Sequence, residues 1–441
     1  EATADDDKIR FTLNGTEHLV MDGAQLNIVN TGGSVFLGDN AGSGDNLLGH
    51  QNVYIGDNAG RIFGEGNTGV GYNSLFNPSG GTFGAENTAV GHSSQLDGGG
   101  SNNCSLGTSS LFSNDTGINN IAIGSDALFS NILGNRNIAI GSAALYHNNN
   151  NDNIAIGDSS LYNSKGLRNV AIGLHAMLKD TFGFGNTAIG YQVLTENLSG
   201  TDNVALGKWA MRINNSGSFN TAVGALALYT NETGFHNAAV GASSMYSNYD
   251  GYYNTALGVS SLQANINGNQ NVAIGFEALY SNMHGSRNIA IGVSALSQNI
   301  YNSELVAIGD SCLYQSTGLR NTAIGIRALQ NDLTGDDNVS IGFESLKLNS
   351  SGDKNVAIGV ESLYSNSGYS NTAIGFQSLK LNTSVENTAV GAEALKNNTN
   401  SNNNTACGFQ SLLNSNGGYN TAFGSLAGNS ITTGSDNTCI G

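Results

Sequence analysis

The stretch Asn137-Ile-Ala-Ile-Gly141-Ser-Ala-Ala-Leu145-Tyr146 contains the pattern that decides the fold of this chain. Its first half, Asn-x-Ala-Ile/Val/Leu-Gly, returns along most of the sequence, and from Gly91 to Gly441 the closing glycines are always 16 or 17 residues apart. Soon after each glycine comes Ala-Leu or Ser-Leu, often followed by an aromatic residue, and then a polar stretch rich in Asn, Ser, Thr and Gly. Self-similarity at a fixed period indicates a repeat architecture in which each repeat packs on its neighbours.

The length and order of these motifs indicate what one repeat builds. It reads as a strand, a tight glycine turn, a second strand and a polar turn, which is too short for a propeller blade and has no helical segment. We therefore expect an all-β fold, a β-solenoid of about 24 coils of 16–17 residues. At the usual spacing between neighbouring strands, these coils would form a rod of about 115 Å.

Residues 1–33 lie outside the repeat and predict a small β region. Lys8–Leu13 and the apolar residues that follow Asn14-Gly15 have the pattern of a hairpin, since Asn-Gly is a strong turn signal. Residues 25–29 would be a third strand. We expect residues 1–33 to form a cap that covers the open edge of the first coil.

The repeat rod is expected to span residues 34–441. Its coils are irregular in residues 34–91 and regular in residues 92–441. Pro78, the single proline, lies in the longest of the irregular intervals. A segment looped out of the stack can tolerate a residue without a backbone N–H group, which is the role we expect for the residues around Pro78.

Composition excludes several other classes of protein. Only 11% of the residues are charged, too few for long coiled-coil helices, while 39% are hydrophobic and recur regularly, which argues against disorder. A collagen-like chain would need far more than one proline among its 61 glycines. The net charge of −17 makes nucleic acid an unsuitable partner. No run of 18 apolar residues exists, so we expect no insertion into a membrane by this segment.

No motif in the sequence predicts catalysis, a metal site or a cofactor. The seven histidines are scattered, and neither Cys-x-x-Cys nor Gly-x-Ser-x-Gly occurs. The Asp- and Gly-rich residues 38–45 lack the regular spacing of calcium-binding repeats. Four cysteines are too few for a disulfide framework, and we expect them to be buried thiols. We therefore expect a protein that is not an enzyme.

The strand of each repeat carries three small or apolar residues in a row, as in Val170-Ala171-Ile172. Alternate residues of a strand face opposite sides, so both sides should be covered. One side would line the coil, and the central alanine would let another backbone approach, which predicts a homo-oligomer. A monomer with an apolar flank is the alternative. The alanines expected at the oligomer interface include Ala122, Ala139, Ala188, Ala222, Ala323 and Ala373.

Two ladders of stacked side chains are also expected. The leading asparagines would hydrogen-bond from coil to coil, a structural role: they include Asn120, Asn137, Asn186, Asn220, Asn321 and Asn371. The residue after each leucine would face solvent and form an aromatic ladder, mainly structural but also a candidate surface for sugars or protein: it is Phe129, Tyr146, Tyr162, Tyr229, Tyr246 and Tyr280.

The pentapeptide with its second short strand resembles the head repeats of trimeric autotransporter adhesins. The longer form, Asn-Thr-Ala-Ile-Gly-x-x-Ala-Leu-x-x-Asn, is similar to repeats of extracellular tail-fibre-like proteins of Bacteroidetes. The resemblance covers about residues 34–441 and implies a left-handed β-roll, a parallel homotrimer and a place on the cell surface. The coils here are longer than those of the adhesin heads, and the 441 residues contain neither a coiled-coil pattern nor an apolar run of the length of a membrane anchor.

These observations lead to a functional hypothesis. We expect a secreted, extracellular, non-enzymatic fibre or adhesin rod at a bacterial cell surface, with cell adhesion as its role and a host or matrix protein or a glycan as its ligand. The start at Glu1 fits a mature secreted protein or a trimmed segment, and the end at Gly441 fits cleavage of a C-terminal chaperone domain or truncation. Rods could also stack end to end into filaments. The alternative is the shaft of a phage-type tail fibre with a receptor-binding role.

Overall fold

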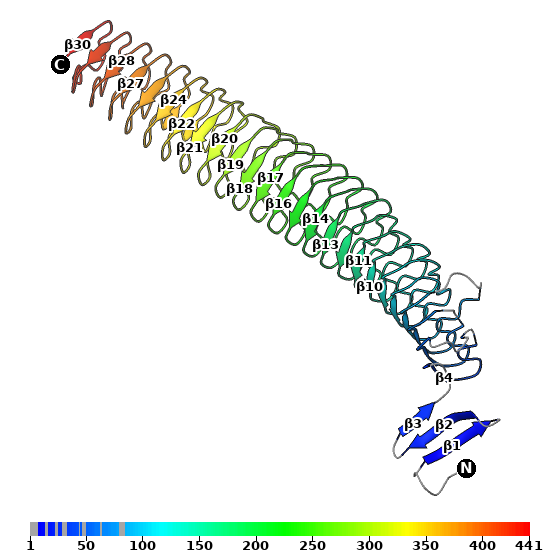
Figure 1. Ribbon diagram of the computed structural model, residues 1–441. Coiled ribbons are helices and arrows are strands. Elements are labelled where there is room, and N and C mark those ends of the chain that lie inside the picture. The colour runs from blue at the N-terminus through cyan, green and yellow to red at the C-terminus, as the bar shows by residue number, and fades with distance from the viewer. Residues whose placement is uncertain are drawn as a thin grey trace. The chain divides into compact units, whose positions relative to one another are not determined.

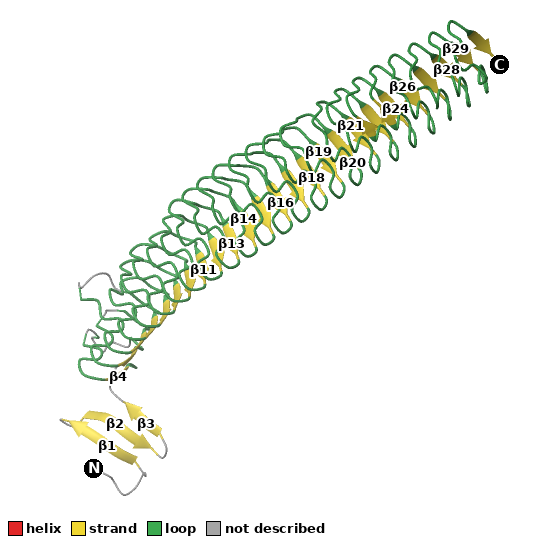
Figure 2. Cartoon of the chain, turned by 180° about the vertical axis from the view of Figure 1, so that it is seen from behind, coloured by secondary structure: helices red, strands yellow, loops and turns green. Residues whose placement is uncertain are grey.

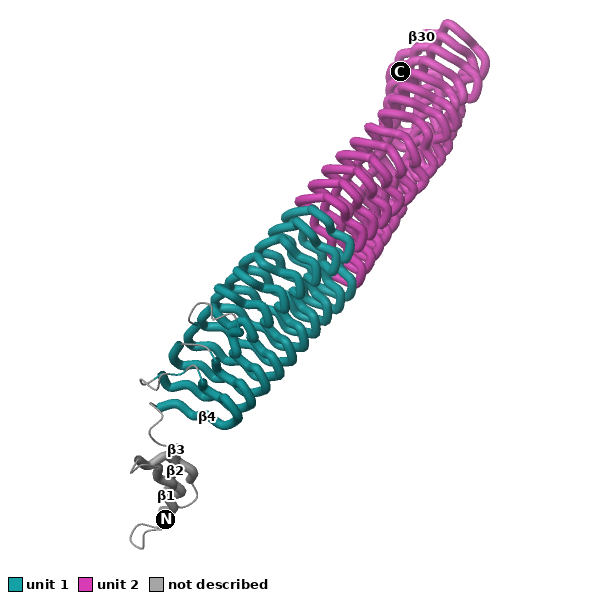
Figure 3. The backbone as a smooth tube through the Cα atoms, turned by 90° about the vertical axis from the view of Figure 1, so that its right-hand side faces the viewer, with its two compact units in different colours: residues 1–206 teal, residues 207–441 magenta. Residues whose placement is uncertain are grey.

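A computed structural model of the protein describes residues 8–13, 16–22, 25–28, 33–43, 45, 50–61, 64–78 and 84–441. Within these residues the chain is all β and has no helix. The chain divides into two compact units, Glu1–Leu206 and Gly207–Gly441 (Figure 3). Both contain the stacked coils of a parallel β-solenoid, with about 23 turns in the two units together, which confirms the predicted fold class.

The N-terminal strands form a separate antiparallel sheet. Strands β1 (Lys8–Leu13), β2 (Thr16–Asp22) and β3 (Gln25–Ile28) pair in the order β1-β2-β3. Leu13 pairs with Thr16 across the first turn, so the predicted hairpin is confirmed, although Asn14-Gly15 lies outside the described residues. The role of this sheet as a cap stays a prediction.

In the first unit each coil contributes one three-residue strand to a parallel sheet (Figures 1 and 2). Consecutive strands pair in register, so that Ala139 lies opposite Ala155 of the next coil. The strands are β4 (Val35–Leu37), β5 (Val53–Ile55), β6 (Thr68–Val70), β7 (Thr88–Val90), β8 (Cys104–Leu106), β9 (Ile121–Ile123), β10 (Ile138–Ile140), β11 (Ile154–Ile156), β12 (Val170–Ile172), β13 (Thr187–Ile189) and β14 (Val204–Leu206).

The second unit repeats this arrangement with the same register. Its strands are β15 (Thr221–Val223), β16 (Ala238–Val240), β17 (Thr255–Leu257), β18 (Val272–Ile274), β19 (Ile289–Ile291), β20 (Val306–Ile308), β21 (Thr322–Ile324), β22 (Val339–Ile341), β24 (Val356–Ile358), β26 (Thr372–Ile374), β27 (Thr388–Val390), β28 (Thr405–Cys407), β29 (Thr421–Phe423) and β30 (Thr438–Ile440).

The predicted second strand of each coil is wrong in most coils. Asp126 and Leu128 have φ angles of 57° and 52°, so the chain alternates between left-handed and right-handed conformations instead of running extended. The backbone still bonds along the stack, since Leu128 N–H donates to the Ala144 carbonyl at 2.9 Å. Within the described residues, β23 (Leu348–Asn349) and β25 (Ser365–Asn366) are the only paired strands on this side, and single parallel bridges join Ile213 to Thr230 and Thr230 to Ser247. The chain must reverse within a few residues, which an extended strand cannot do.

Alanine and leucine side chains fill the interior of the regular coils. Ala122, Ala127 and Leu128 of one coil have no solvent exposure, and their equivalents in neighbouring coils are buried in the same way. Burial of one leucine side chain contributes about 1.5–3 kcal/mol, and every regular coil repeats this contribution. The interior is therefore narrow and continuous within each unit.

The invariable glycine closes the strand at a corner that no other residue fits. Gly141 has a φ of 135°, and a Cβ atom there would lie 2.6 Å from the carbonyl carbon and oxygen of Gly157 in the next coil. Real Cβ atoms do not approach carbonyl atoms so closely. Coils can therefore stack at strand spacing only if this position lacks a side chain.

In the first coils the large interior side chain comes from the strand and the small one from the position after the corner, the reverse of the regular coils. Phe36 and Tyr54 replace the strand alanine, and their rings stack with centroids 5.7 Å apart. Gly42 and Gly60 replace the interior leucine, and a Cβ atom at Gly60 would lie 2.1 Å from the Tyr54 ring. The aromatic rings thus occupy the space that leucine fills elsewhere, which keeps the interior close-packed.

The four cysteines are free thiols with different environments. Cys312 is buried beside Leu313, as predicted, and burial raises the pKa of its thiol to about 12. Cys104 is exposed, because it takes the first, outward-facing position of β8. The prediction that all four are buried is therefore wrong for Cys104, and Cys407 and Cys439 are only partly buried.

Candidate binding surfaces

The six leading asparagines lie in a buried ladder that runs along the stack, as predicted. Asn120 donates its backbone N–H to Asn103 Oδ1 at 2.9 Å, and its own Oδ1 accepts the backbone N–H of Asn137 at 2.9 Å. Its Nδ2 donates to the Gly134 carbonyl at 2.8 Å. Each amide thus satisfies buried backbone groups of two neighbouring coils, which is a structural role.

A second asparagine ladder, which we did not predict, runs along the polar turn. Asn131 Nδ2 donates to Asn114 Oδ1 at 3.0 Å and to the Gly134 carbonyl at 3.0 Å. The same pattern holds Asn231, Asn248 and their neighbours in the second unit. The recurring spacing Asn-x-x-Gly is the signal that could have revealed it.

Two rungs of this second ladder carry a buried carboxyl group, Asp180 and Asp332. Ser164 Oγ donates to Asp180 Oδ2 at 3.2 Å, and Asn197 Nδ2 donates to Asp180 Oδ1 at 2.6 Å. The equivalent bonds to Asp332 measure 3.1 and 2.8 Å. Burial raises the pKa of both carboxyl groups to about 7, because desolvation outweighs these hydrogen bonds.

The six alanines predicted at an oligomer interface lie elsewhere. Their side chains are fully buried inside their own coil, so they do not face another chain. The reason is the strand period: the middle residue points inward, and the residues before and after it point outward. The correction concerns Ala122, Ala139, Ala188, Ala222, Ala323 and Ala373.

The outward residues of the strands form what we call the strand face. They are Val, Ile or Thr before the alanine in most coils, and Ile, Val or Leu after it. Leu206 and Leu257 are 40% and 48% exposed, and Ile121 is 37% exposed. The strand face therefore presents one apolar column along each unit, beside a column in which Val and Ile alternate with Thr.

A third column distinguishes the two units. It consists of the residue that directly follows each corner glycine, two positions beyond the last outward strand residue. In the first unit it is mostly polar, as at Thr108, Ser125, Ser142 and Asp158. In the second unit it is largely apolar and between 42% and 49% exposed at Val259, Phe276, Val293, Ile326, Phe343, Val360, Phe376 and Phe409.

The predicted aromatic ladder consists of separate stacks. Phe129, Tyr146 and Tyr162 stack at 5.0 Å between successive ring centroids. In the second unit Tyr229 stacks on Tyr246 at 5.0 Å. Tyr280 occupies the same position in a coil whose neighbours carry Gln263 and Ser297 there, so it lies outside these stacks. Ligand binding by the ladder stays a prediction.

A second aromatic cluster, which we did not predict, lies in the polar turns of the second unit. Phe219, His236 and Tyr253 stack at 5.0 and 5.1 Å. Phe235 and Tyr252 form a parallel column at 5.0 Å. The aromatic residues two and one positions before the leading asparagine are the signal that marks it.

The described residues also bear on metal binding and on membrane insertion. Among them, no group of three or more His, Cys, Asp or Glu side chains is placed to hold a metal ion. The same part of the chain contains no helix long and apolar enough to cross a membrane. Comparison with protein-family models, with curated proteins and with solved structures finds no match to this chain.

Proposed function

We propose that this chain is a secreted, non-enzymatic fibre or adhesin rod at a bacterial cell surface, assembled from three parallel copies. The observation that carries the proposal is the apolar strand face, widened in the second unit by the third column. In that unit, the exposed apolar residues of the three columns between Leu257 and Phe409 show 36–49% of their surface to water. A soluble monomer rarely exposes a contiguous apolar surface of this kind.

The extent of this surface matches that of a stable interface. Fifteen apolar residues between Leu257 and Phe409 contribute to it, and each has an exposed fraction between 36% and 49%. At about 150–250 Å² for each phenylalanine side chain and somewhat less for each Val, Ile or Leu, they expose on the order of 1,000 Å², whereas a standard interface buries about 800 Å² on each partner. Covering this surface would therefore suffice for a stable assembly.

A second copy of the chain is the occupant that fits best. Two strand faces have the same period, so their apolar columns meet in register along their length. The face also carries little charge: in the third column of the second unit between Val259 and Phe409, Asp310 is the one charged residue. The negative charge of the chain therefore does not oppose contact through this face. The resemblance of the repeat to adhesin heads favours three copies.

Charged substitutions in the strand face test the proposal. We expect Ile274→Lys with Ile341→Lys to lower the mass of the particle in solution to that of one chain, because the buried charges would be unpaired. Ser351→Lys, at an exposed position of a polar turn, is the control and should leave the mass unchanged. Equal masses for the double variant and the unchanged chain would contradict the proposed interface. Electron micrographs of the same samples would test end-to-end stacking.

A further inference from the structure

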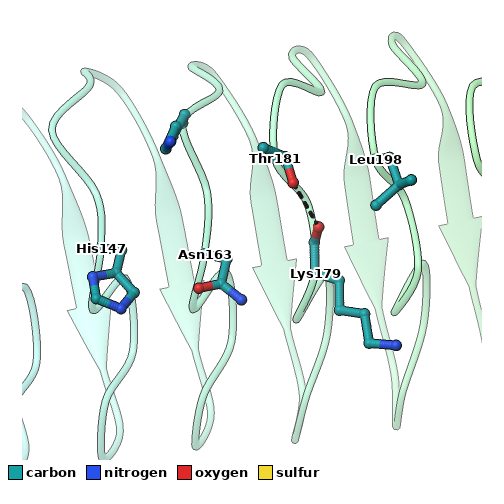
Figure 4. A pocket seen from close by; sticks show the side chains of 6 residues that line it. His147, Asn163, Lys179, Thr181 and Leu198 are labelled. Atoms are coloured by element: carbon teal, nitrogen blue, oxygen red, sulfur yellow. Dashed lines mark hydrogen bonds between the residues drawn. The ribbon is translucent and has the colours of Figure 1, made fainter.

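A groove on the turn side of the first unit gathers positively charged side chains (Figure 4). Its volume is about 550 Å³. The side chains come from neighbouring coils, and Thr181 Oγ1 donates to the Lys179 carbonyl at 3.2 Å at its centre. The lining residues are His147, Asn163, Lys165, Lys179, Thr181 and Leu198.

Two consecutive short coils explain the recess. Residues 137–152 and 153–168 form 16-residue coils, each one residue shorter in the polar turn than the 17-residue coils that follow. In a longer coil, Asn197 Nδ2 bonds the carbonyl three residues ahead at 3.0 Å. In the short coils the bond spans two residues, from Asn148 Nδ2 to the Asn150 carbonyl at 3.0 Å and from Gly166 N–H to Ser164 Oγ at 3.2 Å. The polar turn is therefore one residue shorter in two consecutive coils, which leaves a recess at the surface.

The second unit also has two consecutive short coils, but without the lysines of the groove. Residues 355–370 and 371–386 are also consecutive 16-residue coils, and Asn366 and Asn382 bond two residues ahead at 2.8 Å. The positions that match His147, Lys165 and Lys179 there carry uncharged residues, which are Ser365, Thr383 and Asn397. Paired short coils thus fold without lysine or histidine at these positions, so packing does not account for these side chains.

The two lysines are accessible to an anion. Lys179 Nζ lies 3.2 Å from Glu196 Oε1, but both side chains are largely exposed, and such a pair contributes at most about 1 kcal/mol. Lys165 is exposed, with its Nζ 6.0 Å from the centre of the Phe182 ring. Each amine can therefore donate charge-assisted hydrogen bonds to a carboxylate or sulfate of a ligand.

Aromatic rings border the same groove. The His147 imidazole lies edge-on to Tyr146 and Tyr162, with ring centroids 4.7 and 5.3 Å apart. Tyr162 ends the stack of the first unit, since Leu178 takes this position in the next coil. The rings at the end of this stack offer an apolar surface for a sugar ring at the His147 end of the groove, while the amines hold its acidic groups.

We propose that this groove binds an acidic saccharide, with its carboxylate or sulfate groups at Lys165 and at Lys179 and one of its rings against the end of the aromatic stack. The groove lies on the turn side, away from the strand face, so assembly through the strand face leaves it open. The site is an addition to the proposed fibre and does not depend on the number of copies.

Titration of the full chain with polysaccharides tests this assignment. Heparin supplies sulfate, polygalacturonate supplies carboxylate alone, and dextran is the neutral control. We expect at least one of the two acidic polysaccharides to bind and dextran not to bind. A preference for heparin would assign the acidic group to sulfate. Equal binding of heparin and polygalacturonate would show that the groove accepts either acidic group. Failure of both acidic polysaccharides, or binding of a DNA duplex in preference to both, would overturn the proposal.

Exchange of the groove residues between the units provides matched variants. Lys165→Thr with Lys179→Asn gives the first groove the residues of the second and should weaken binding at least tenfold. Arg287→Asn with Lys354→Asn removes the same charge at exposed positions of polar turns elsewhere and should leave binding unchanged. Ser365→His with Thr383→Lys and Asn397→Lys should create a second site. Equal losses in the two double variants would show that net charge, not the groove, determines binding.

The mass of each variant in solution, measured in parallel, separates this inference from the proposed assembly. The groove variants should keep the mass of the unchanged chain, because they do not touch the strand face. A single-chain mass with intact binding would contradict the assembly alone, and loss of binding by the unchanged chain would contradict the groove alone.

Discussion

The two units of this protein share one repeat and differ in what the repeat presents to its surroundings. Both have the corner glycine, the leading asparagine ladder, the ladder of the polar turn and one buried Ser-Asp-Asn rung. They differ in the column after the corner glycine, polar in much of the first unit and apolar in the second, and in the charges over their paired short coils. The shared residues are those that the fold requires. The differing residues are free to serve binding.

The strongest test of what is shared concerns the corner glycine. Gly141→Val in the first unit and Gly275→Val in the second should each lower the free energy of unfolding by at least about 4 kcal/mol, because the new Cβ atom would collide with the next coil. Urea denaturation followed by circular dichroism measures the loss. Ser142→Val, one residue further on and exposed, is the control. If only one of the two variants had a lower free energy of unfolding, the corners of the two units would not be equivalent.

The buried carboxyl groups predict a pH dependence that both units share. The pKa of Asp180 and of Asp332 is raised from 3.8 to about 7, so the folded state holds a proton that the unfolded chain has already released. Their contribution is complete below pH 3.8 and is lost as the pH rises through about 7, a change of about 4 kcal/mol for each carboxyl group. Unfolding free energies measured between pH 4 and 8 test this.

Asp180→Asn and Asp332→Asn should each remove about half of that dependence, because an amide does not titrate. The double variant should show none of it. If the slope between pH 4 and 8 persists in the double variant, other groups are responsible and the two rungs do not act alike.

Removing one rung of the leading asparagine ladder should have a smaller effect. Asn137→Ala leaves the buried N–H of Asn153 without its acceptor, and Asn271→Ala does the same to the N–H of Asn288, at a cost of about 1–3 kcal/mol each. The same denaturation experiment measures it, with the exposed Asn163→Ala as control. A difference of more than about 1 kcal/mol between the two units would mean that the ladders are not equivalent.

Changes in the third column should hardly affect unfolding and should instead alter association. Phe276→Ser with Phe343→Ser gives the second unit the polar column of the first and should weaken self-association at least tenfold by sedimentation. Both side chains are exposed in one chain, so the unfolding free energy of the separated chain should change by less than about 0.5 kcal/mol. Unchanged association would show that the two outward strand columns suffice.

Spacing alone was enough to predict the solenoid, because a glycine every 16 or 17 residues admits few other folds. The leading asparagine ladder followed from its fixed place beside that glycine. The direction of the alanines did not follow, because three apolar residues in a row leave open which of them face inward. The left-handed conformation of Leu128 could not be predicted either, because leucine rarely adopts it.

The groove of the first unit was beyond sequence reasoning for a different reason. His147, Lys165 and Lys179 come from separate coils, and only the loss of one residue from each of two consecutive turns brings their side chains to one recess. The shortened intervals were visible in the sequence, but their consequence for the surface required the stacked coils.

The mass of the particle in solution tests the central claim, that the strand face is covered by further copies of the chain. One chain has a mass of 45.4 kDa. Light scattering in native buffer should give three times this mass for the unchanged chain and the single-chain mass for Ile274→Lys with Ile341→Lys. A mass of 45.4 kDa for the unchanged chain, at every concentration at which it is soluble, would contradict the account.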